Sequence, residues 1–119
     1  MGLFKSKQVT QVNEKIDHVQ EFENIWLNLS EKMMRVTFTT EEPYLKDVDV
    51  VAEDDIIRLT HSGILIAEIG KRSKAFEELK SKAGIRALSM TFQKETGDYG
   101  EYYHCRMKFA GTSSYIIGK

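Results

Sequence analysis

The sequence predicts an α+β domain built on a strongly bent antiparallel sheet, or small β-barrel, of about six strands. An amino-terminal helix and one helix between strands 4 and 5 belong to the same prediction. Apolar residues are spaced by three or four positions in the first quarter of the chain, and by two in most of the rest. Glycine-containing turns follow two of the alternating segments, at Gly63 and at 97–100, and 119 residues are enough for one domain with its own core.

The amino-terminal helix is the first element with a clear pattern. Residues 1–8 show no pattern and are expected to form a flexible arm, which leaves 9–119 as a single domain. The apolar spacing that follows is typical of one face of a helix, and it changes near 28–30, where we expect the helix to end. The apolar positions are Val9, Val12, Ile16, Val19, Phe22, Trp26, Leu29 and Met33.

Four strands are predicted after this helix. Residues 34–39 alternate between apolar and polar side chains, and valines mark a second strand over 48–51. Residues 56–60 and 64–69 are expected to pair as a hairpin. Gly63 can adopt the positive φ that the connecting turn needs.

The second helix and the last two strands complete the prediction. Residues 71–83 are expected to form a helix that Ser73 caps and Gly84 ends. Strands over 85–95 and 101–110 follow, joined by a glycine-containing loop. The residues expected to face the core are Ala75, Phe76, Leu79 and Ala83 in the helix, Leu88, Met90 and Phe92 in the fifth strand, and Tyr103, Cys105, Met107 and Phe109 in the sixth.

Composition narrows the classes of protein. A single cysteine excludes an internal disulfide and a thiolate-rich zinc site, and no apolar run is long enough for a membrane-spanning helix. The amino terminus lacks the features of a secretory signal, so we expect a cytoplasmic protein. Gly2 with Ser6 matches the short myristoylation pattern, but this pattern is common by chance, so we expect an unmodified, solvated start.

No combination of side chains predicts catalysis, and the chain is expected not to be an enzyme and to need no cofactor. His18, His61 and His104 have no metal-ligand spacing. His104 and Cys105 are neighbours in a strand, so their side chains point to opposite faces and Cys105 is expected to be a small core residue. Residues 41–55 hold seven carboxylates and one lysine, which suggests either a divalent-cation site or solvated turns. The spacing fits no calcium loop, so we expect no metal.

Basic and aromatic residues gather in the carboxy-terminal half. Residues 71–86 hold six basic and two acidic side chains, and the outward face of the last strand combines rings with cations. Such a face suits nucleic acid, because bases stack on rings while cations meet phosphates. The candidate binding residues are Lys71, Arg72, Lys74, Arg86, Tyr102, His104, Arg106 and Lys108.

The chain from about 34 to 109 also carries a pattern of motifs. It contains Asp-Asp-Ile-Ile-Arg-Leu over 54–59, then His-Ser-Gly, then Ile-Ala-Glu-Ile-Gly over 66–70, with a glycine-terminated helix and two closing strands. This order resembles a HIRAN domain, a β-barrel-like module associated with single-stranded DNA ends or altered DNA. The nearest matches to the residues of that family are Tyr44, in Glu-Pro-Tyr, and Arg58.

Two functions follow as expectations. The first is a non-catalytic module that binds single-stranded or end-exposed DNA through the basic and aromatic face. The alternative is a protein-interaction or self-assembly module, in which the apolar stripe of helix 9–30 meets a partner or a second copy.

Overall fold

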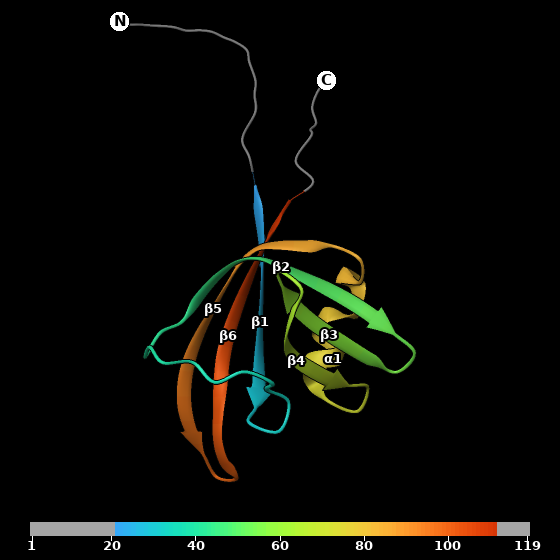
Figure 1. The fold of residues 1–119 in the computed structure, drawn as a ribbon. Helices are drawn as coiled ribbons and strands as arrows, with labels where there is room; N and C mark the ends of the chain where they lie inside the picture. Colours follow the sequence, from blue (N-terminus) through green and yellow to red (C-terminus); the bar gives the residue numbers. More distant parts are fainter. Residues whose placement is uncertain (1–20, 112–119) are drawn as a thin grey trace, which may run out of the picture. The chain divides into compact units, whose positions relative to one another are not determined.

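The computed structural model describes residues 21–111 (Figure 1). The predicted arm over 1–8 and the first part of the predicted amino-terminal helix, 9–20, lie outside the described residues. Residues Glu23–Phe109 form one compact unit. Within the described residues, no helix has the length and apolar character needed to cross a membrane.

Six strands form one sheet in the order β1-β6-β5-β2-β3-β4, and they curve as an antiparallel half-barrel (Figure 1). The predicted six-stranded, bent antiparallel sheet is therefore confirmed. One short α-helix, α1, and a single 3-10 turn, η2, lie between β4 and β5. The elements are β1 Phe22–Ser30, β2 Tyr44–Glu53, β3 Ile56–His61, β4 Ile64–Gly70, α1 Lys74–Leu79, η2 Lys80–Lys82, β5 Arg86–Gly97 and β6 Gly100–Ala110.

The predicted amino-terminal helix is wrong over its described part, because residues 22–30 form strand β1. Ile25, Leu27 and Leu29 are buried, while the residues between them are exposed. The strand buries a different set of residues from the predicted helical stripe, because Phe22 and Trp26 are exposed and only Leu29 of that stripe is buried in β1. The apolar helical face that we expected to meet a partner therefore does not exist over residues 22–30, because these residues form a strand.

The predicted strand over 34–39 is also wrong, because this segment is a loop with one isolated bridge, Met34 to Ala67. The backbone N–H of Arg35 donates to the carbonyl of Ile66 at 2.8 Å, and that of Glu68 donates to Met33 at 2.9 Å. Half-buried and exposed side chains still alternate over 34–39, as predicted, although no regular ladder of backbone hydrogen bonds forms there. The loop that follows β1 thus covers the edge of β4, the strand at the far end of the sheet.

The hairpin of β3 and β4 is confirmed, with Ser62 at φ 51° and Gly63 at φ 79° in its turn. The predicted cap is also present, since the Ser73 hydroxyl accepts the N–H of Phe76 at 3.2 Å. The predicted helix over 71–83 is too long. Its α-helical part is only Lys74–Leu79, and the 3-10 turn that follows leaves Ala83 exposed.

The core prediction for the fifth strand fails at Leu88, which is 38% exposed. Its neighbours Ala87 and Ser89 are buried instead, and the buried face changes by one residue between Ser89 and Met90. The adjoining strand β2 has Asp47 at φ 56° between the residues paired with Ala87 and Ser89. The backbone kink at Asp47 accounts for the change of face, which alternation in the sequence of β5 does not show.

The Cys105 thiol is expected to be inert in the native protein. It is fully buried on β6, and burial raises its pKa from 9.0 to about 12. Because the thiolate is the reactive form, iodoacetamide at about pH 8 should alkylate the native chain at least about 100-fold more slowly than the urea-unfolded chain, as mass spectrometry would show. The unfolded chain releases this proton above about pH 9, so stability should fall as the pH rises from there toward 12. Equal labelling rates for the two states would contradict this assignment.

Candidate nucleic-acid interface

The outward side of β6 carries the four residues that the sequence analysis selected on this strand. Tyr103, Cys105, Met107 and Phe109 point into the core and are buried. The alternate side chains are half-buried on the opposite face of the sheet, and they are Tyr102, His104, Arg106 and Lys108.

Trp26 of β1 lies against this face. Its ring stacks on His104 with centroids 5.2 Å apart and planes 17° apart. The guanidinium carbon of Arg106 lies 5.8 Å from the centroid of the tryptophan ring. The Nδ1–H of His104 donates to Oδ1 of Asn28, 2.8 Å away, which holds the histidine ring in place. Trp26 nevertheless remains 53% exposed.

Tyr44 extends the same face across the sheet. Arg106 pairs with Thr91 of β5, and Thr91 pairs with Tyr44 of β2, so these three side chains lie in one row. Tyr44 is 55% exposed. Three strand spacings separate β1 from β2, so the backbones of these two strands lie about 14 Å apart along the sheet.

A hollow of about 320 Å³ lies between the two exposed rings. We call Trp26, Tyr44, His104 and Arg106 the aromatic face. The hollow is lined by Trp26, Glu42, Pro43, Tyr44, Thr91, Phe92, Gln93 and His104.

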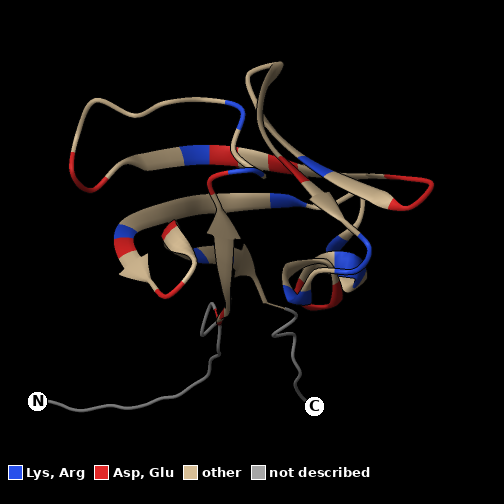
Figure 2. Cartoon of the chain, turned by 90° about the horizontal axis from the view of Figure 1, so that it is seen from below, with Lys and Arg blue, Asp and Glu red and all other residues tan. Residues whose placement is uncertain are grey.

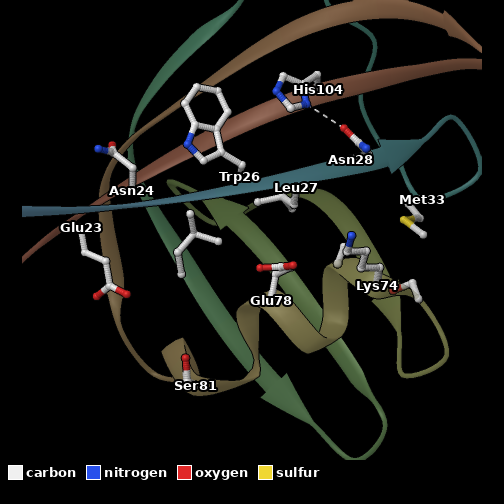
Figure 3. A pocket seen from close by; sticks show the side chains of 13 residues that line it. Glu23, Asn24, Trp26, Leu27, Asn28, Met33, Lys74, Glu78, Ser81 and His104 are labelled. Atoms are coloured by element: carbon white, nitrogen blue, oxygen red, sulfur yellow. Dashed lines mark hydrogen bonds between the residues drawn. The ribbon is translucent and has the colours of Figure 1, made fainter.

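The basic residues predicted near the helix are not gathered on the aromatic face. Lys71 pairs with Asp55 at 3.3 Å, and Arg72 is exposed in the turn that follows β4, at the opposite end of the sheet order. Arg86 holds Asp49 through two hydrogen bonds of 2.7 and 3.2 Å, which lower the pKa of that carboxyl. Only Lys74 lies near, because it lines a second cavity together with Trp26 and His104 (Figure 3).

Three carboxylates of the acidic segment 41–55 form ion pairs with basic side chains. Figure 2 shows basic and acidic residues interspersed along the described chain. Besides Asp49 and Asp55, Glu53 pairs with Arg58, which also bonds Glu68. No group of three or more His, Cys, Asp or Glu side chains within 21–111 is placed to hold a metal ion.

Sequence reasoning missed Trp26 as a site residue and used Tyr44 only for the family resemblance. In residues 24–29, Ile25, Leu27 and Leu29 have the period of a strand, but Trp26 between them is also apolar and hides that alternation. The pairing of β1 with β6 was not visible in the sequence either, because it joins residues 76 positions apart, as the contact of Asn28 with His104 shows.

No protein-family model, curated protein or solved structure matches this chain. The resemblance to HIRAN domains therefore stays a prediction. Of its two nearest matching residues, Tyr44 lies on the aromatic face, whereas Arg58 is engaged by Glu53 and Glu68.

Proposed function

We propose that this chain is a non-catalytic module that binds single-stranded nucleic acid, DNA in particular, through the aromatic face. The observation that carries the proposal is the placement of two half-exposed rings, Trp26 and Tyr44, on one side of a sheet with Arg106 between them. Exposed rings on a sheet are the usual platform on which two or three unpaired bases stack.

The rings, the cations and the amides of this region would each contact a different part of the nucleic acid. One base stacks on the exposed part of the Trp26 ring, which also contacts His104 and Arg106. A second base stacks on Tyr44 across the hollow. The cations of the outward side of β6 meet phosphates, which gives affinity without dependence on base sequence. The amides of Asn28 and Gln93 flank His104 on its two neighbouring strands and can bond base edges.

A titration with a labelled 15-nucleotide oligothymidine tests the proposal. Fluorescence anisotropy at low salt should show saturable binding, and Trp26, the sole tryptophan, should be quenched as bases cover it. Binding should weaken with salt, with a slope of about 0.7 in log–log form for each phosphate neutralised.

A duplex of the same length is the matched comparison. It should bind more weakly, because its bases are already stacked and cannot reach the rings. Absence of any anisotropy change with the single strand at about 50 μM protein would overturn the proposal, because that concentration is near the weak end of the Kd range for non-specific binding at physiological salt, and low salt strengthens such binding further.

A further inference from the structure

A second, larger cavity of about 670 Å³ runs along the free edge of β1 (Figure 3). Six consecutive residues of that strand, 23–28, line it. Successive side chains of a strand point to opposite faces, so a cavity that touches all of them lies along the edge of the strand and not on one face. This groove is separate from the hollow of the aromatic face, although Trp26 and His104 border both.

The edge of β1 offers backbone groups for pairing. Among the described strands, only β6 lies beside β1, which ends the sheet order. An edge strand presents a row of N–H and C=O groups that an extended chain can pair with. Six residues at about 3.3 Å each give about 20 Å of edge, which is long enough for five or six residues of an added strand.

The opposite wall of the groove is formed by α1 and the 3-10 turn η2 that follows it. Figure 3 shows Lys74 near the Asn28 end of the groove, Glu78 in the middle and Ser81 toward the Glu23 end. The helix therefore runs antiparallel to β1. An extended chain that pairs antiparallel with β1 would run in the same direction as α1.

The charges on this wall lack partners within the described residues. Glu77 pairs with Lys80 at 2.8 Å and Glu23 pairs with Lys82, but neither Lys74 nor Glu78 has an ion pair in residues 21–111. Four helical residues advance about 6 Å along the axis, and two strand residues advance about 6.6 Å. Lys74 and Glu78 are thus spaced to meet side chains i and i+2 of an extended chain.

We propose that the groove binds an extended peptide segment of another protein as an added antiparallel strand. The segment carries an acidic side chain facing Lys74 and, two residues later, a basic side chain facing Glu78. The residue between them points to the other face of the sheet, beside the exposed ring of Trp26, and is apolar. The partner motif is therefore acidic–apolar–basic in chain order.

A synthetic peptide tests this directly. The probe is a blocked eight-residue peptide of threonine and valine with Glu-Val-Lys at its centre, titrated into the full chain while the emission of Trp26 is followed. We expect a saturable change with a Kd below about 1 mM. The same peptide with Lys-Val-Glu at its centre should bind about tenfold more weakly, since both pairs become repulsive.

Exchange of the two charges in the protein is a more decisive test, because it predicts a reversal of the peptide preference and not only a loss of binding. The double variant Lys74→Glu and Glu78→Lys should reverse the preference, binding the Lys-Val-Glu peptide about tenfold more tightly than the Glu-Val-Lys peptide. The exchange of Glu77→Lys and Lys80→Glu on the same helix is the matched control and should leave the preference unchanged, because neither residue lines the groove.

N-methylation of the peptide tests separately whether its backbone forms hydrogen bonds with the edge of β1. N-methylation of one set of alternate amides in the peptide should abolish binding, whereas methylation of the other set should spare it, because only one set faces β1. The proposal is overturned if no saturable change occurs up to about 1 mM peptide. It is also overturned if the charge exchange leaves the preference unaltered, or if light scattering shows that a second copy of the chain fills the groove.

Discussion

Replacement of Trp26 by alanine is expected to weaken binding of the 15-nucleotide oligothymidine by about tenfold to hundredfold. Base stacking on an aromatic side chain contributes about 1–3 kcal/mol, and Trp26 offers the largest ring of the aromatic face. The side chain is 53% exposed, so its truncation leaves little unfilled space in the core. The variant should therefore unfold close to the wild-type midpoint, and anisotropy titration would give the loss of affinity separately.

Ile64→Ala is the matched control for this variant. Ile64 is an exposed apolar residue on β4, at the other end of the sheet order from Trp26. Its truncation should leave the affinity for the oligonucleotide within about twofold of wild type, because surface changes far from a site have small effects. Wild-type affinity in Trp26→Ala, with loss of binding in Ile64→Ala, would place the nucleic acid elsewhere on the molecule.

Phe92→Ala is expected to destabilise the fold by about 3–5 kcal/mol. Phe92 is 2% exposed and packs on Phe38 and Tyr103, with ring centroids 4.7 and 5.9 Å away. The same ring joins β5 to the long loop that contains Phe38. Since a domain of this size has about 5–15 kcal/mol in total, the loss should lower the urea midpoint steeply.

Gln93→Ala provides the comparison, because Gln93 is the next residue on β5 and is exposed. Its unfolding free energy should stay within about 0.5 kcal/mol of wild type. Complete loss of the cooperative transition in Phe92→Ala would agree with the expected cost. A change below about 1 kcal/mol would show that the aromatic cluster is not packed as described.

The elements predicted correctly are those whose signals are local. The hairpin of β3 and β4 needs only two apolar runs and a turn residue that tolerates positive φ, and both are contiguous in the chain. The cap at Ser73 and the pairing of β5 with β6 across a glycine-containing loop are local in the same sense. Turn chemistry and side-chain alternation act over a few residues, so they can be seen without the rest of the fold.

The errors occur where a long-range contact selects between two local patterns. The apolar residues around Trp26 fit a helix and a strand, and β1 is a strand because β6 supplies its hydrogen bonds and the core covers Ile25, Leu27 and Leu29. Likewise the kink at Asp47 changes the buried face of β5, a strand that lies about forty residues further along.

Residue order alone was sufficient to predict a bent antiparallel sheet and the ring-and-cation face of β6, since alternation along a strand assigns every second side chain to one side. The assembly of Trp26, Arg106 and Tyr44 into one face came from strand pairing across the whole chain. Such pairing depends on the burial gained by the complete sheet, a property that no single segment contains.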